Sequence, residues 1–187
     1  MTSIFFLLRL FQLRSFLLAQ RVKIDSKKPG KIEIECNEAW SFVTNKNNKQ
    51  WIGLALDKKT REIVGCYIGE RGEVGARELW NSLPPIYRQC AVCYTDFWSA
   101  YALVLPSKRH KSVGKAKQRG LGGFPHERLF QEETGLTNHI ERFNNTQRLR
   151  ISRLVRRTLS FSKKLENHIG AIWNFIHHYN LAIASKS

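Results

Sequence analysis

Cys90-Ala-Val-Cys-Tyr-Thr-Asp96 is a run of strand-forming residues that ends in a carboxylate. A short, nearly all-apolar strand of this kind is typical of a position buried on both faces of a sheet. Side chains at the carboxyl ends of such strands gather at one edge of the sheet, where ligands commonly bind. The stretch therefore predicts a central strand that presents Asp96 at a sheet edge.

The segments before this strand alternate between apolar and polar residues, which is the period of half-buried strands. Residues 31–43, 51–56 and 62–68 are predicted to form three strands, joined by short turns at residues 45–49 and 57–60. Short connections join antiparallel neighbours, so these strands form an antiparallel meander.

Helical periodicity follows the meander and returns after the fourth strand. Residues 73–83 carry apolar residues at helical spacing and stop at Pro84-Pro85, and residues 97–105 form the next helix. Residues 108–131 are basic and contain several glycines, which predicts a loop.

Two further helices are predicted from residue 137 onward. The first has an apolar face made of Ile140, Phe143, Ile151 and Leu154. The second spans residues 165–179, with Ser160 or Ser162 as its cap. The order β-β-β-α-β-α followed by helices is that of the ribonuclease H-like fold. We therefore predict an α/β protein with a ribonuclease H-like mixed sheet (three-strand antiparallel meander plus a further strand) flanked by helices, with basic helices at the C-terminal end.

The positive charge is concentrated in one part of the chain. Residues 108–164 hold 15 Lys and Arg against four acidic residues, and so carry 11 of the 16 net positive charges. Such a block favours a polyanionic partner, because it neutralises phosphates and releases counterions. A ribosomal protein or a merely solubilising basic face is the alternative.

The N-terminal segment is expected to lie outside the core. Its apolar residues 1–20 are interrupted by Arg9 and Arg14, so neither part reaches the roughly 18 residues of a membrane span, and residues 21–30 form a polar linker. The four cysteines lack the dense spacing of a secreted disulfide framework, which favours reduced thiols in a cytoplasmic protein. We expect one domain over residues 31–187 and no stable membrane association.

Two acidic residues are candidates for metal-dependent phosphate chemistry. Two divalent ions about 4 Å apart can activate an attacking oxygen and stabilise a leaving one, and magnesium prefers carboxylate oxygens as ligands. Asp96 would be one ligand, or else a cap on the following helix. Glu141 is the only acid among residues 135–164, beside eight Lys and Arg, and would be another, or else part of a solvated helix face.

The basic residues around Glu141 are candidate phosphate contacts. They are Arg142, Arg148, Arg150, Arg153, Arg156, Arg157, Lys163 and Lys164.

The third acid of such a site is missing from the first strand, where the chain has Asn37. An amide oxygen can ligate a metal ion but brings no negative charge. Glu35 shares a strand face with Asn37 but lies roughly 6–7 Å away along the strand, and Glu38 points to the other face unless a bulge turns it. No acid therefore replaces the missing one.

Six segments resemble the catalytic part of the IS-one family of bacterial insertion-sequence transposases. They are NEAWSFV, REIVGCYIGER, ARELWNSLP, AVCYTDFWSAY, TGLTNHIERFNNT and SRLVRRTLSFSKKLENHIGAIWNFIHHYN, between residues 37 and 180. The resemblance implies a ribonuclease H-like core with a DDE triad and Mg²⁺ (or Mn²⁺). The second Asp of the triad falls on Asp96, its Glu on Glu141, and its first Asp on Asn37. It also implies double-stranded DNA partners (element ends and target), a homo-oligomer on DNA, and a place at the bacterial nucleoid.

Two departures from the family pattern qualify these expectations. Asn37 puts metal binding and activity in doubt, and residues 116–131 look like an insertion. The family's upstream zinc-finger and helix-turn-helix region has no counterpart in this sequence. We expect a transposase for DNA strand cleavage and strand transfer, impaired by Asn37. The alternatives are a catalytically dead, basic DNA-binding protein that modulates an active transposase, and a nuclease that is not a transposase.

Overall fold

The computed structural model describes residues 32–96, 98–112, 136–154 and 161–185. A five-stranded mixed sheet with the order β3-β2-β1-β4-β5 forms its centre. The strands are β1 (Glu33–Phe42), β2 (Lys49–Asp57), β3 (Ile63–Gly69), β4 (Val92–Thr95) and β5 (His110–Ser112). β1, β2 and β3 pair antiparallel, whereas β4 pairs parallel with both β1 and β5. The predicted ribonuclease H-like sheet, with its meander and further strand, is confirmed.

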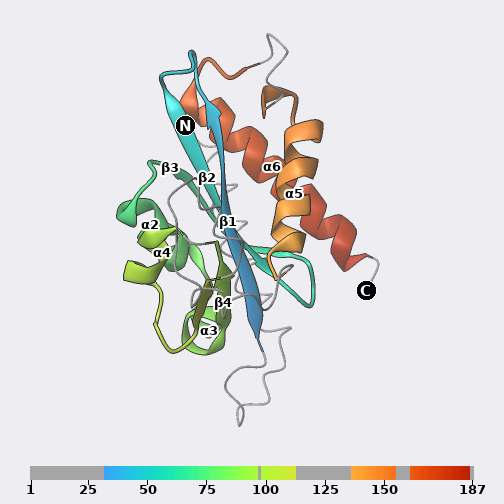
Figure 1. Ribbon diagram of the computed structural model, residues 1–187. Helices are drawn as coiled ribbons and strands as arrows, with labels where there is room; N and C mark the ends of the chain where they lie inside the picture. The colour runs from blue at the N-terminus through green and yellow to red at the C-terminus, as the bar shows by residue number, and fades with distance from the viewer. Residues whose placement is uncertain (1–31, 97, 113–135, 155–160, 186–187) are drawn as a thin grey trace, which may run out of the picture.

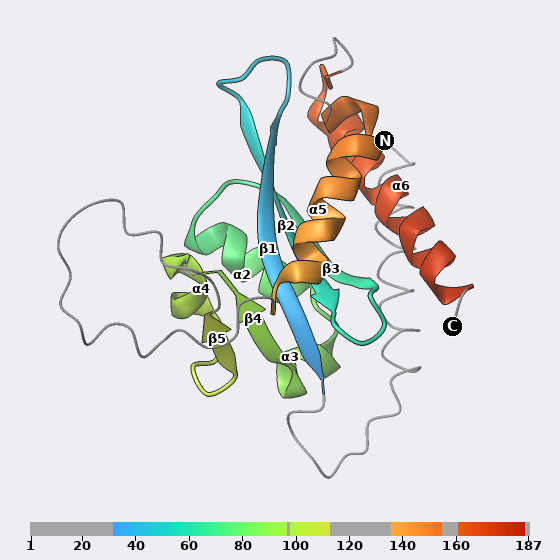
Figure 2. The ribbon, with the colours of Figure 1, turned by 45° about the vertical axis from the view of Figure 1, so that its right-hand side comes forward.

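Helices cover both faces of this sheet. They are α2 (Glu73–Ser82), α3 (Pro85–Cys90), α4 (Ser99–Val104), α5 (Asn138–Arg150), the 3₁₀ helix η2 (Ser152–Leu154) and α6 (Leu165–Ala184). α2, α3 and α4 lie on one side of the sheet, and α5 and α6 lie side by side on the other (Figure 1). Turning the molecule shows α5 running alongside β1 (Figure 2). None of the helices in the described ranges is long and apolar enough to cross a membrane.

The strand register assigns each side chain of β1 to one of two cores. Ile34 and Cys36 belong to the core under α2, α3 and α4. Leu54 of β2 belongs to the core under α5 and α6 and is the partner of Asn37 in the β1–β2 register, which is continuous from Ile34 to Phe42. Because paired residues share a face, Asn37 lies on the α5 face and Glu38 on the α2 face. The expectation that Glu38 points away from Asn37 is thereby confirmed.

Several details differ from the sequence-based expectation. Residues 108–131 were expected to form a loop, but His110–Ser112 adds β5 to the sheet edge. α3 follows Pro84 directly, because Pro85 at its first position suits a helix start. The last helix is not capped by a serine: its N-cap is Lys164, without a side-chain cap bond, and Ser162 is fully buried. Residues 1–30, the proposed insertion at 116–131, and Ser160 fall outside the described residues.

His168 of α6 makes the stability of the fold depend on pH. Its side chain is fully buried, and neither ring nitrogen has a hydrogen-bond partner among the described residues. Burial, reinforced by the Arg153 charge, lowers the pKa of His168 from 6.5 to about 4. The folded protein therefore holds this imidazole neutral at pH values where the unfolded chain would protonate it.

We expect the contribution of His168 to stability to be fully present above about pH 6.5 and to be lost as the pH falls toward 4. The loss should reach up to about 3 kcal/mol. Urea unfolding at pH 7 and pH 4.5, with His168→Leu beside the unchanged protein, measures it. The variant should lose less stability on acidification, whereas His178→Gln, at an exposed position of the same helix, should behave as the parent does. Equal pH dependence in all three proteins would contradict the assignment.

Candidate functional site

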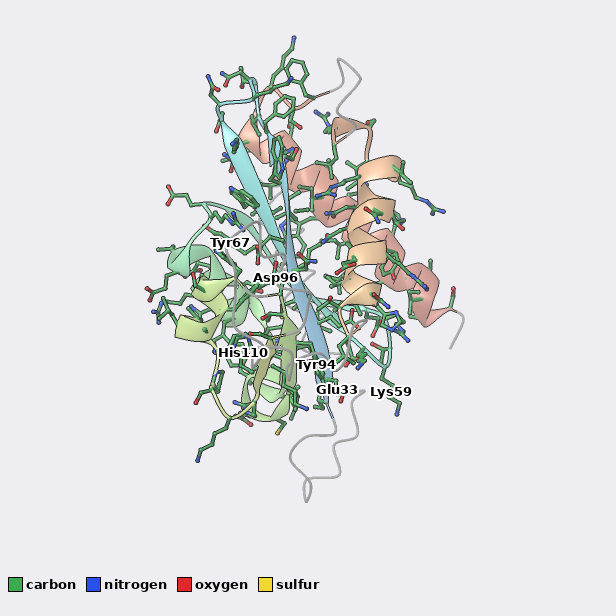
Figure 3. All side chains as sticks on the ribbon, in the orientation of Figure 1. Glu33, Lys59, Tyr67, Tyr94, Asp96 and His110 are labelled. Atoms are coloured by element: carbon green, nitrogen blue, oxygen red, sulfur yellow. The ribbon has the colours of Figure 1, made fainter. Side chains whose placement is uncertain are left out.

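The parallel pairing of β1 with β4 bears on where Asn37 and Asp96 lie. The register pairs Glu33 with Val92 and Glu35 with Tyr94. Two residues further along each strand stand Asn37 and Asp96. Figure 3 shows Asp96 near the middle of β1, beyond Tyr94 and His110. The last paired residues are Glu35 and Tyr94, so Asn37 and Asp96 both lie just past the paired segment, and their proximity stays a prediction.

The carboxylate of Asp96 holds the turn that follows β4. Its Oδ1 accepts a hydrogen bond from the backbone N–H of Trp98 at 3.1 Å, just before α4 begins at Ser99. Thr95 supports the same turn, because its hydroxyl donates to the Asp96 carbonyl oxygen at 2.8 Å. Asp96 therefore stabilises the turn before α4, but it does not cap the helix as the alternative interpretation expected, because the N-cap residue is Trp98 and α4 has no side-chain cap hydrogen bond. The role of Asp96 as a metal ligand stays a prediction.

Glu35 fastens β1 to the start of α5. Its Oε2 accepts hydrogen bonds from the backbone N–H groups of His139 and Ile140, both at 2.9 Å, and its side chain is fully buried. Burial raises the pKa of Glu35, and the two backbone hydrogen bonds oppose that shift. A carboxylate at this place also suits the positive end of the helix dipole. This contact spans 105 residues of sequence and was not foreseen from the sequence.

Glu141 lies in the first turn of α5, next to the residues that Glu35 holds. Its side chain is exposed, and its Oε1 accepts a hydrogen bond from the Thr137 hydroxyl at 3.1 Å. Thr137 is also the N-cap residue of α5. Through Glu35, the turn that carries Glu141 is bonded to the strand that carries Asn37. Convergence of Asn37, Asp96 and Glu141 on one point remains a prediction that this arrangement favours.

Glu38 belongs to a different cluster on the α2 face. It lines a small hollow with Trp51, Tyr67 and Trp98, and only 6% of its side chain is exposed. Arg71 approaches its Oε2 at 3.8 Å and lies over the rings of Trp51 and Trp98, at 4.2 and 4.9 Å from their centroids. Burial raises the pKa of Glu38 to about 7, and the nearby Asp96 charge adds to that rise. Arg71 is therefore held between the rings of Trp51 and Trp98.

The sequence that forms these elements is similar to that of known proteins. The sequence model described as IS1 transposase matches residues 31–121 and 126–181. The chain belongs to the IS1 transposase family. It is 32% identical over 142 residues to the insertion element iso-IS1n protein InsB of Shigella dysenteriae, an alignment that covers 76% of this chain and 92% of the relative. It is 29% identical over 157 residues to the insertion element IS1 4 protein InsB of Escherichia coli K12, with 81% of each chain covered.

DDE-type transposases such as those of the IS1 family typically use divalent metal ions, and the donor set at the triad positions can be tested against that need. The set consists of one amide and two carboxylates, and the amide oxygen of Asn37 already accepts the Glu38 N–H at 2.6 Å. In the part of the chain that the structure describes, no three His, Cys, Asp or Glu side chains are grouped to hold a metal ion. Two divalent ions would bring four positive charges against two negative ones. The residues present therefore do not fit a two-ion site.

The candidate phosphate contacts follow α5 away from the triad positions. Arg142, Arg148 and Arg150 lie on α5, and Arg153 lies on η2. Lys163 and Lys164 immediately precede α6. Arg156 and Arg157 fall outside the described residues. The basic set thus extends from the first turn of α5 to the start of α6 on the side of the sheet that also bears Asn37.

Proposed function

We propose that this chain is a transposase catalytic core that binds double-stranded DNA and whose strand-cleavage centre is impaired by Asn37. The observation that carries the proposal is the neutral amide of Asn37 on β1, the parallel neighbour of the strand that Asp96 follows. In a family that typically uses divalent ions, this position ordinarily supplies a carboxylate. The intact family reaction would cleave the ends of an insertion element and join a 3′-hydroxyl to target DNA.

Asp96 and Glu141 are the proposed ligands of a remaining Mg²⁺ or Mn²⁺ ion. A metal ion in such a site would supply Lewis-acid stabilisation of charge on a phosphodiester. The protein contributes the sheet edge that bears Asp96, the Glu35 contact that anchors the first turn of α5, and the basic residues beyond it. Asn37 can orient a polar group but cannot neutralise metal charge.

A second candidate function is a DNA-binding protein without cleavage activity that modulates, or assembles with, an active transposase. The incomplete donor set at Asn37 favours it. We further propose that residues 31–187 form the catalytic domain, that residues 116–131 are an insertion, that the protein acts as a homo-oligomer on DNA, and that it works at the bacterial nucleoid in the cytoplasm.

Binding and nicking measured side by side test the proposal. On a duplex that carries an insertion-element end, we expect salt-sensitive binding with and without magnesium, and nicking near background in both cases. Asp96→Ala should preserve salt-sensitive binding, because the substitution removes none of the basic residues. Strong magnesium-dependent nicking that Asp96→Ala abolishes would contradict impairment by Asn37. Loss of all DNA binding at low salt would contradict both candidate functions.

The salt dependence of DNA binding should show whether the basic face of α5 contacts the DNA. Arg142 and Arg150 are both exposed on this helix. Replacing both with Gln should reduce the slope of log affinity against log salt concentration by about two, one for each lost phosphate contact. Fluorescence anisotropy at several salt concentrations measures the slope. An unchanged slope would place the DNA on another surface.

A further inference from the structure

A polar hollow of about 380 Å³ opens between η2 and the start of α6. Its lining is formed by Ser152, Arg153, Phe161, Lys163 and Asn167. The hollow lies at the far end of α5 from Glu141. It is therefore separate from the triad positions.

The tip of the β1–β2 hairpin holds the wall of this hollow in place. The Thr44 N–H donates to the Ser162 carbonyl oxygen at 2.8 Å, and the Thr44 hydroxyl donates to the Lys163 carbonyl oxygen at 3.1 Å. The rings of Phe42 and Phe161 pack with their centroids 5.6 Å apart. The backbone that carries Lys163 is therefore fixed by contacts across more than 100 residues of sequence.

Arg153 is oriented from the opposite wall. Its guanidinium approaches the Ser162 hydroxyl at 3.5 Å, and that serine is fully buried. Arg153 also lies close enough to His168 to help lower the pKa of the imidazole to about 4, so the histidine adds no charge near neutral pH. None of the ion pairs found within the described residues involves Arg153 or Lys163. Glu166 is exposed and is not among the lining residues.

Besides these two cations, the start of α6 supplies backbone N–H groups that can donate hydrogen bonds. α6 is 20 residues long, and its N-cap Lys164 makes no side-chain cap bond. The first N–H groups of a helix have no partner within the helix, and the positive end of the helix dipole favours an anion. Asn167, in the first turn, lines the hollow together with Arg153 and Lys163. Two cations, a serine and an asparagine thus line one hollow beside the start of α6.

We propose that this hollow binds a single phosphate group of the DNA backbone, away from the cleavage centre. The proposal rests on the DNA-binding function proposed above and gives it a second anchoring point. From Glu141 to the end of α5 at Arg150 the helix rises by about 14 Å, at 1.5 Å per residue, and the hollow begins just beyond, at Ser152. At 3.4 Å per base pair, this distance corresponds to about four to five base pairs of duplex. The bound phosphate would lie about half a helical turn from the nucleotide at the triad positions.

A titration with inorganic phosphate tests the hollow directly. We expect saturable NMR shifts of the backbone amides of residues 165–168 and of the Arg153 side-chain N–H groups. Sodium chloride at equal ionic strength should not produce them, and the paired variant Arg153→Gln/Lys163→Gln should abolish them. Unchanged thermal unfolding of the variant shows that its fold is intact. Shifts spread over the whole basic surface, or unchanged in the variant, would overturn the proposal.

A second experiment tests whether the phosphate group that binds in the hollow belongs to DNA. On a duplex of about 20 base pairs, the paired variant should reduce the salt slope of binding by about two. The control Arg77→Gln/Lys108→Gln also removes one Arg and one Lys, which are exposed in α2 and in the connection from α4 to β5. This control should reduce the salt slope by much less. Phosphate shifts without a change in slope would assign the hollow to free phosphate and overturn the DNA assignment. The readouts do not depend on cleavage, so an inactive triad leaves this test intact.

Discussion

Asn37→Asp is expected to raise magnesium-dependent nicking by about 100- to 1,000-fold over the unchanged chain. A preorganised electrostatic contact at a reacting centre typically contributes a factor of this size, and the new carboxylate would complete the donor set with Asp96 and Glu141. Asn37 lies two residues past the last β1 residue that pairs with β4, and Asp96 directly follows β4, so the substitution would put a carboxylate near the end of this strand pair. The measurement is nicking of a DNA that carries the element's end, with an end-recognition region supplied in trans.

The controls separate a repaired site from an unrelated nuclease. Asp96→Ala in the Asn37→Asp background should return nicking to background, and Glu73→Gln should not, because Glu73 is an exposed residue of α2 outside the proposed site. Magnesium titration by calorimetry should show tighter overall binding of magnesium to Asn37→Asp than to the parent, whose donor set lacks the charge for a second ion. Equal magnesium affinity in the two proteins would contradict the role assigned to position 37 even if neither protein cleaves DNA.

Glu35→Ala should destabilise the fold by about 3–5 kcal/mol. The substitution leaves the N–H groups of His139 and Ile140 buried without an acceptor, at about 1–3 kcal/mol each, and opens a cavity between β1 and α5. Urea unfolding at pH 7 measures the loss. Glu35→Gln keeps an acceptor of the same shape, so its loss should be smaller.

Glu33→Ala is the matched control, two residues earlier on the same strand. The Glu33 side chain is 38% exposed and pairs with Lys58 at 3.2 Å, a contact that contributes about 1 kcal/mol or less. If Glu35→Ala cost no more than Glu33→Ala, the anchoring of α5 by Glu35 would be wrong.

The alternation of apolar and polar residues and the turn signals were sufficient to predict the meander and the order of the main elements. Period-two patterning in residues 31–68 gave the three strands within about two residues of β1, β2 and β3. β5 could not be found in this way, because His110-Lys-Ser112 is short, polar and half-exposed. It is a strand because β4 offers a free edge, which is a tertiary effect that local propensity does not report.

The site was less accessible to sequence reasoning than the fold. Asn37 and Asp96 were placed from strand order and family pattern, and the structure confirms that β1 and β4, the strands that lead to them, are parallel neighbours. Glu35 was considered only as a substitute ligand. One signal was available in the sequence: Glu35 is an ionisable residue on a strand that was predicted to be half-buried. An ionisable residue that packs against a core needs a specific partner. That its partner is the start of a helix 105 residues later requires the tertiary structure.

The long reach of the Glu35 contact bears on the proposed insertion at residues 116–131. That contact fixes α5 on β1, so the chain must close the connection between β5, which ends at Ser112, and α5, which begins at Asn138. The entropy lost on closing a flexible loop grows only with the logarithm of its length, so removing 16 residues from this connection would change the closure free energy by only about 1 kcal/mol. An insertion here therefore costs little chain entropy, and the Glu35 contact can hold the start of α5 in place with or without it.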